Sequence, residues 1–151
     1  MSTLRRRIGR LMGARQPALQ VAALCVNGDT GKVLMITSRG TGRWIIPKGW
    51  PMPGRSLAEA ALQEAWEEAG VRANPGRRIG SYNYDKMQSG GFAIPVLVHV
   101  FLTRVESLAE DYPESGRRER RWVAPDEAAA MVAEGDLATL LRQLGPGPAA
   151  C

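Results

Sequence analysis

Three glutamates lie close together in a chain that otherwise carries an excess of positive charge. The segment from Ser56 to Val71 holds four glutamates and no Lys or Arg, although the whole chain of 151 residues has a formal net charge of +5. Glu64, Glu67 and Glu68 occupy positions i, i+3 and i+4, so a helix would place their carboxylates on one face, about 5 to 6 Å apart. Carboxylate oxygens in this arrangement suit a hard divalent cation such as Mg²⁺.

The sequence marks both ends of the helix that would carry these glutamates. Ser56 is a suitable N-cap, Glu59 completes a capping box, and Gly70 fits a left-handed C-cap. The residues between are mostly strong helix formers, without Pro or β-branched residues. Residues on the opposite face should pack against the core. These are Leu62, Trp66 and Ala69.

A solvent-exposed helix face is the alternative interpretation of this acidic segment. A stabilised surface helix alternates Glu with Lys at i, i+4, whereas adjacent like charges destabilise a helix by roughly 0.2 to 0.5 kcal/mol per pair. A bound cation would remove the repulsion between the carboxylates. The pattern therefore favours a metal site.

The segment from Gly49 to Val71 resembles the Nudix box, the motif of the Nudix hydrolase family. The pattern of that box is Gx5Ex7REUxEExGU, where U is a bulky apolar residue. Gly49 matches its first position and QEAWEEAGV, residues 63–71, matches its end. The approach through residues 44–48, WIIPK, is also similar to that of the family. The resemblance is specific over about residues 44–71 and extends in strand order over about residues 18–144.

The resemblance implies an α/β fold, a Nudix-type α/β/α sandwich around a mixed β-sheet, and Mg²⁺-dependent hydrolysis of a phosphoanhydride, with Mn²⁺ as a substitute metal. We expect Glu64 and Glu68, which lie one turn apart, to bind the metal. Glu67 would be the general base that deprotonates the attacking water, and it would contribute to the metal site. The roles of Glu67 and Glu68 are exchangeable, because members of the family differ.

Two positions depart from the Nudix box pattern. Arg55 stands where the family has its first Glu, and Gln63 stands where the family has Arg. The first Glu is at the loop end of the motif, so Arg55 should matter little. The family Arg orients the carboxylates, and loss of such support typically costs about 10- to 100-fold. Gln63 lies four residues from both Glu59 and Glu67, so its amide could donate to either carboxylate and partly compensate.

Substrate phosphates require cations and hydrogen-bond donors. The substrate-binding candidates are Arg39, Arg43, Lys48, Gly49, Trp50, Arg117 and Arg118. For the Arg residues the alternative is a solvated turn or charge run, and for Trp50 it is packing against its own loop. The cluster around Arg117 also resembles the diphosphoinositol polyphosphate phosphohydrolases, a branch of the family.

Other polar residues have weaker grounds for a role. Glu114 and Glu119 are candidates for additional metal or base groups, although nothing in their spacing fixes them. His99 lies in an apolar run, where a hydrogen-bonded strand histidine is the default interpretation.

The expected substrate is a nucleoside diphosphate derivative, a dinucleoside polyphosphate or a diphosphoinositol-type molecule. An alternative is RNA 5′-pyrophosphate hydrolysis, which the sequence pI of about 9.8 allows without a recognisable RNA-binding motif. A second alternative is a catalytically weak module that binds a nucleotide or sugar phosphate. We expect no membrane partner, and either a monomer or a homodimer.

The composition fits one globular domain, which we place at residues 17–144 with the Nudix box at 49–71. We expect residues 1–16 to form a basic N-terminal arm and residues 145–151 to form a flexible tail. The two cysteines do not make a disulfide framework, and there is no signal peptide, so we expect a cytoplasmic protein. The expected strands are 18–26, 32–37, 79–84 and 94–105, with a mobile loop at 83–94 and helices at 125–133 and 136–144, the latter capped by Asp136.

Overall fold

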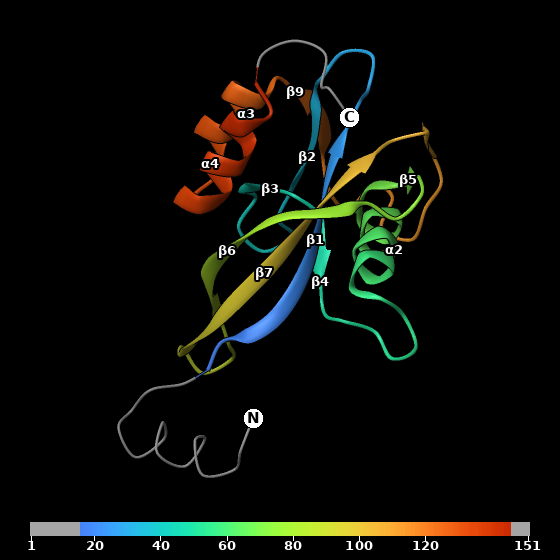
Figure 1. The fold of residues 1–151 in the computed structure, drawn as a ribbon. Helices are drawn as coiled ribbons and strands as arrows, with labels where there is room; N and C mark the ends of the chain where they lie inside the picture. The colour runs from blue at the N-terminus through green and yellow to red at the C-terminus, as the bar shows by residue number, and fades with distance from the viewer. Residues whose placement is uncertain (1–15, 146–151) are drawn as a thin grey trace.

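The computed structural model describes residues 16–145, which form a mixed β-sheet with helices on both faces (Figure 1). The strands are β1 (Ala18–Val26), β2 (Val33–Thr37), β3 (Trp44–Ile45), β4 (Lys48–Gly49), β5 (Val71–Arg72), β6 (Arg77–Met87), β7 (Ala93–Arg104), β8 (Ser107–Leu108) and β9 (Arg120–Val123). The helices are α2 (Leu57–Ala69), α3 (Pro125–Met131) and α4 (Gly135–Gln143). Within the described residues, no helix is long and apolar enough to cross a membrane.

The sheet combines parallel and antiparallel pairing. Its main order is β3-β2-β1-β7-β6, with β4 beside β1 and β9 beside β2, while β5 and β8 form a separate pair. β1 and β7 are parallel along their length, from Ala18↔Val96 to Val26↔Arg104, and the other pairs are antiparallel. The expected mixed sheet is confirmed.

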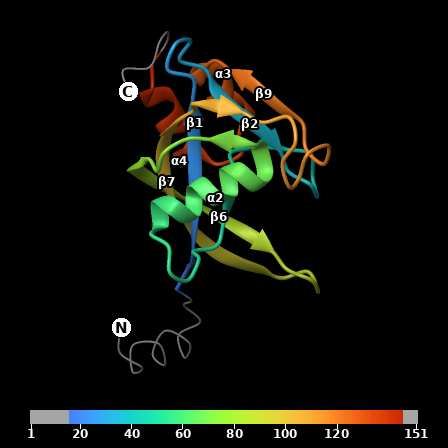
Figure 2. The same ribbon diagram turned by 90° about the vertical axis from the view of Figure 1, so that its right-hand side faces the viewer.

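Alternate residues of β1 belong to two separate cores, because successive strand side chains point to opposite faces. Ala22, Leu24 and Val26 lie in the core beneath α3 and α4, and Val21, Ala23 and Cys25 lie in the core beneath α2. Figure 2 shows α2 in front of the sheet, with α4 behind it. The α/β/α sandwich predicted from the sequence is therefore confirmed.

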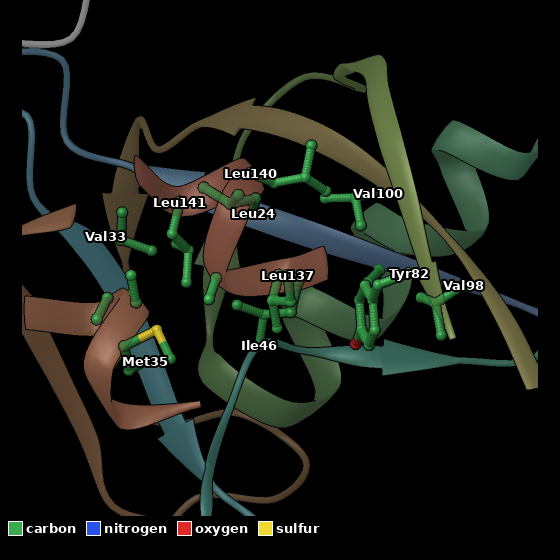
Figure 3. Packing of buried hydrophobic residues seen from close by; sticks show 14 of the residues in the cluster. Leu24, Val33, Met35, Ile46, Tyr82, Val98, Val100, Leu137, Leu140 and Leu141 are labelled. Carbon is green, nitrogen blue, oxygen red and sulfur yellow. The ribbon is translucent and has the colours of Figure 1, made fainter. Parts of the chain in front are cut away.

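The core beneath α3 and α4 joins both helices to the sheet (Figure 3). Leu137 and Leu141 of α4 are fully buried against side chains that include Leu24 and Met35. Ile46, which precedes β4, is also fully buried in this core and so anchors the entry to the Nudix box. Burial of each such side chain contributes about 1.5 to 3 kcal/mol.

Helix α2 faces the sheet through small residues, and one part of the predicted face is wrong. Its buried apolar residues are Ala60, Ala61, Ala65 and Ala69. Leu62 and Trp66 are only half-buried and belong to neither core, because the alanine face turns toward the sheet. The guanidinium of Arg72 instead lies over the Trp66 ring, 4.5 Å from its centroid. Glu68 is also among the buried residues of α2, whereas the sequence predicted that the three glutamates would share a solvated face opposite the core.

Three further expectations about elements need correction. The predicted mobile loop at 83–94 is mostly strand, because β6 runs to Met87 and β7 starts at Ala93, which leaves a short turn closed by a Gln88 N–H to Phe92 carbonyl bond of 2.8 Å. Helix α3 ends at Met131. Asp136 is not the cap of α4, since the helix begins at Gly135, after Glu134, with no side-chain cap bond.

Candidate active site

The capped ends of α2 fix the positions of its three glutamates. The Ser56 hydroxyl accepts from the Glu59 N–H at 3.1 Å, and the Glu59 carboxylate accepts from the Ser56 N–H at 2.7 Å. Gly70 has a φ of 70°, which closes the helix in the left-handed conformation. The predicted capping box and C-cap are both confirmed.

Glu68 is a buried carboxylate with two cationic or donor partners. Only 7% of the residue is exposed. The backbone N–H of Lys48 donates to its carboxylate at 3.3 Å, and the Arg118 guanidinium lies 3.8 Å away. Burial raises the pKa of Glu68 to about 7, although Arg118 and the Lys48 bond oppose the shift. The carboxyl is thus poised to exchange a proton for a cation.

Glu64 is half-buried and close to other carboxylates. Burial, followed by the charges of Glu68, Glu67 and Glu114, raises the pKa of Glu64 to about 8. A Cβ atom placed on Gly49 would collide with the Glu64 carboxyl group. Glycine at this position therefore gives the carboxylate room against the backbone of β4.

Glu67 is connected to the two residues that depart from the Nudix box pattern. The side-chain amide of Gln63 donates to the Glu67 carboxylate at 2.9 Å, and the Arg55 guanidinium donates to the Gln63 amide oxygen at 3.2 Å. Of the two carboxylates considered for Gln63, the structure selects Glu67. The Glu67 carbonyl also accepts from the Glu114 N–H at 3.0 Å, which attaches the loop before β9 to α2.

A pocket of about 380 Å³ is lined by Glu64 and Glu68 together with several cationic side chains. Its polar and charged lining residues are Gln20, Ser38, Arg39, Lys48, Glu64, Glu68, Tyr84, Lys86 and Arg118. Trp50 is 44% exposed at the same pocket. A lining that combines carboxylates with cationic side chains suits an anion bound through a metal.

Arg118 has little freedom in this pocket. Its side chain is 11% exposed, donates to the Glu114 carboxylate at 3.1 Å and to the Thr37 carbonyl at 3.1 Å, and contacts Glu68. Arg39 differs, because 54% of its side chain is exposed and its contact with Glu114 is 3.8 Å long. Arg39 is therefore the more available cation for a substrate phosphate.

The structure brings together most of the site residues expected from the sequence. Arg39, Lys48, Gly49, Trp50, Glu64, Glu68 and Arg118 line the pocket. Glu67 and Gln63 lie beside it without lining it. Arg43 and Arg117 are exposed and are outside the lining. Glu114 lies at the edge of the site, whereas Glu119 is exposed.

Four polar lining residues are absent from the candidates named from the sequence: Gln20, Ser38, Tyr84 and Lys86. Tyr84 donates its hydroxyl to the Gln20 amide oxygen at 2.6 Å, and the Lys48 ammonium lies 5.1 Å from the centre of the Tyr84 ring. Lys86 follows Tyr84 by two residues on β6 and so shares its face. Two features of the sequence could have identified three of these residues: the two-residue spacing of Tyr84 and Lys86 along one strand, and the polar Gln20 within an apolar strand.

His99 has a structural explanation. Its Nδ1 lies 2.9 Å from the Ser81 hydroxyl on the neighbouring strand. Burial and Arg78 lower the pKa of the imidazole. It is a hydrogen-bonded strand side chain, in agreement with the sequence interpretation.

The donor set fits Mg²⁺. Residues 16–145 contain no preassembled group of three or more His, Cys, Asp or Glu side chains around one cation position. Even so, the pKa values of Glu64 and Glu68 are raised by burial, and Glu64 has room for its carboxylate beside Gly49. Oxygen ligands that repel one another are what a hard cation stabilises.

The sequence of residues 16–144 matches the NUDIX domain family. The chain belongs to the Nudix family of hydrolases. It is 32% identical over 123 residues to Nudix hydrolase 18, mitochondrial, from Arabidopsis thaliana, an alignment that covers 79% of this chain and 66% of that protein. It is also 32% identical over 119 residues to diphosphoinositol polyphosphate phosphohydrolase 3-alpha from Mus musculus, covering 75% and 68% respectively.

Solved structures of Nudix proteins have the same fold. A NUDIX hydrolase from Nitrosomonas europaea superposes with a TM-score of 0.64 at 25% identity, over 89% of this chain and 94% of that chain. Members of the Nudix family act on pyrophosphate bonds of nucleotide derivatives and generally use a divalent metal, typically Mg²⁺. This chain spans just under two thirds of the length of the plant relative.

Proposed function

We propose that this Nudix protein is a Mg²⁺-dependent hydrolase that cleaves a phosphoanhydride bond in a phosphorylated small molecule. The observation that carries the proposal is a single pocket whose lining includes both Glu64 and Glu68 and the cations Arg39, Lys48 and Lys86. A pyrophosphate group carries several negative charges, so its binding requires both a metal and side-chain cations. The lining of this one pocket can supply both.

Each glutamate has a separate place in this proposal. Glu64 and Glu68 would hold the metal, with Glu67 beside them. When bound, Mg²⁺ would neutralise the substrate phosphates and lower the pKa of a coordinated water. The sequence assigned the general base to Glu67, and the pocket lining makes Glu64 a second candidate, because it faces the space where the substrate would bind.

The cations divide into those that bind substrate and those that position carboxylates. Arg39 and Lys48 are proposed to contact phosphate oxygens. Burial lowers the pKa of Lys48, and Glu68 opposes this shift, so an anionic substrate would favour the charged ammonium. Arg118 already contacts three acceptors, so we assign it to holding Glu68 and Glu114 in place. Trp50 could stack on a planar ring of the substrate.

The names of the relatives support a proposal for the substrate class. The mouse relative is named a diphosphoinositol polyphosphate phosphohydrolase, which supports a diphosphoinositol-type substrate for this chain. Nucleoside diphosphate derivatives and dinucleoside polyphosphates remain in the proposed range, because the pocket of about 380 Å³ also holds an exposed Trp for a base. The cytoplasmic location stays a prediction, and the plant relative is named mitochondrial.

A substrate panel tests the proposal directly. Purified protein with Mg²⁺ is incubated with nucleoside diphosphate derivatives, dinucleoside polyphosphates, diphosphoinositols and triphosphorylated RNA, and the products are separated by anion exchange. We expect metal-dependent cleavage of at least one small molecule. Cleavage of RNA alone would support the RNA 5′-pyrophosphohydrolase. Tight binding without turnover across the panel would support the binding module.

A further inference from the structure

The two residues that depart from the Nudix box pattern contact each other. The Arg55 guanidinium donates to the Gln63 amide oxygen at 3.2 Å, and the Gln63 amide nitrogen donates to the Glu67 carboxylate at 2.9 Å. Arg55 precedes the N-cap of α2, whereas Gln63 and Glu67 lie one turn apart within the helix. The two departures are therefore a contiguous hydrogen-bonded unit that ends on a glutamate of the candidate metal site.

Arg55 determines which way the Gln63 amide points. A guanidinium has only donors, so the amide group must turn its oxygen toward Arg55. Its NH₂ group then necessarily faces Glu67, where it donates. Without Arg55, the amide oxygen loses its donor, and the Glu67 carboxylate alone then favours this orientation of the amide.

We propose that Arg55 and Gln63 together position the carboxylate of Glu67, in place of the Glu and Arg that the Nudix box pattern has at these positions. The inference rests on the proposed function insofar as Glu67 serves a metal site. In the box pattern an acidic residue precedes a cation, and here a cation precedes a neutral amide. The contacts observed in this chain direct a donor at Glu67, so Arg55 is a positioning residue that acts through Gln63.

A second role of Arg55 has to be separated from this one. Two hydrogen bonds from Ser56 lower the pKa of Glu59, and the charge of Arg55 lowers it further. Arg55 therefore also lies close to the capping box. The matched control is Glu59→Gln, which removes the charge near Arg55 but keeps a residue that can complete a capping box.

The test compares two replacements of Arg55 that differ in hydrogen-bonding character. Arg55→Met removes the donor, and we expect it to weaken Mn²⁺ binding, measured by electron paramagnetic resonance without substrate, by about 10-fold. Arg55→Glu supplies only acceptors, so it should attract the Gln63 NH₂ group and turn the amide oxygen toward Glu67. Arg55→Glu should therefore weaken Mn²⁺ binding more than Arg55→Met does.

The double variant Arg55→Glu/Gln63→Arg restores the order of the box pattern. We expect the double variant to bind Mn²⁺ with the wild-type affinity. Arg55→Glu alone should have the lowest Mn²⁺ affinity of all the variants. The side-chain amide resonances of Gln63 in the metal-free protein provide a second measurement, and they should shift more in Arg55→Glu than in Glu59→Gln. Thermal unfolding of each variant shows that the fold is retained.

Two results would overturn the inference. One is equal Mn²⁺ affinity for wild type, Arg55→Met and Arg55→Glu. The other is an Arg55→Glu/Gln63→Arg variant whose change in the free energy of Mn²⁺ binding equals the sum of the changes in Arg55→Glu and in Gln63→Arg, each measured alone, which would mean that the residues act independently. Because metal affinity is read without substrate, a wild-type protein that binds Mn²⁺ but cleaves nothing counts against the hydrolase and leaves the positioning unit testable.

Discussion

The backbone N–H of Lys48 donates to the carboxylate of Glu68 at 3.3 Å, so the residue just before the Nudix box holds a glutamate near the end of the box. Lys48 belongs to β4, which pairs with β1 through Ala22↔Lys48 and Val21↔Gly49. The next residue, Gly49, lies against Glu64. Both carboxylates that line the pocket thus lie against β4, a strand of the central sheet. This contact helps to fix the positions of two side chains that helix α2 carries.

The two candidates for the general base can be separated by isosteric variants. Glu67→Gln should lower kcat at saturating Mn²⁺ by at least about 10²-fold, the low end for general-base catalysis, and it should also weaken Mn²⁺ binding because Glu67 is proposed to lie in the metal site. Glu64→Gln should weaken Mn²⁺ binding because Glu64 is proposed as a ligand, and it should lower kcat at saturating Mn²⁺ by a similar factor only if Glu64 is the base. Wild-type kcat in Glu67→Gln would exclude that residue as the base.

Arg118 should be important for stability, whereas its neighbour in the chain should not. Replacing Arg118 by Met leaves the Thr37 carbonyl without this donor and removes the cation beside Glu68 and Glu114. We expect the free energy of unfolding to fall by about 1 to 3 kcal/mol, measured by urea denaturation. Arg117→Met is the matched control, since that side chain is exposed, and its effect should be within about 0.5 kcal/mol. Equal effects would contradict the role of Arg118.

Features of the site that depend on residues close together in the chain were predictable from the sequence. The capping box and Gly70 fixed the bounds of α2, and the Nudix box spacing brought Lys48, Glu64 and Glu68 to one place. Capping depends on residues only a few positions apart, so it does not require knowledge of the tertiary structure. Strand β1 was also predicted with its observed bounds, because its nearly continuous apolar run is visible in the local sequence.

Features that depend on tertiary pairing were not predictable. Lys86 lies at the pocket because β6 continues past the expected strand end at residue 84 and pairs with β7 up to Met87↔Ala93, and the place of Tyr84 in the lining also depends on the pairing of β6 with β7. The inward face of α2 was misplaced because hydrophobicity favoured Leu62 and Trp66, whereas close packing on the sheet selected the alanines. Arg118 was expected to bind substrate, and only the fold shows that Thr37 and Glu114 already occupy its guanidinium.

The metal-free protein should lose stability as the pH rises. The pKa of Glu64 is raised from 4.5 to about 8 and that of Glu68 from 4.5 to about 7, mainly by burial. Between pH 4.5 and about pH 8, the folded state binds more protons at these two carboxyl groups than the unfolded state does. The free energy of unfolding therefore falls as the pH rises in this range. The favourable contribution is complete below about pH 4.5 and is lost as the pH passes the folded pKa values.

Urea denaturation in EDTA at pH 5 and pH 8 measures this contribution, as the difference between wild type and Glu64→Gln. We expect the wild type to lose more stability than the variant between the two pH values. Added Mg²⁺ should remove most of the difference, because a cation would replace the proton. A wild type that gains stability relative to Glu64→Gln as the pH rises would contradict the raised pKa of Glu64.

Gly49 should be required for metal binding more than for folding. A Cβ at this position would meet the carboxyl group of Glu64, which is the end of a flexible side chain, so Gly49→Ala would displace the carboxylate while the strand persists. We expect Mn²⁺ affinity to fall by about 10-fold or more, with a much smaller change in thermal stability. Gly135→Ala is the matched control, because the space around Gly135 is open and the position is at the start of α4. Metal affinity should be unchanged in that variant, and an equal loss in both would show that the close approach of Gly49 to Glu64 does not matter.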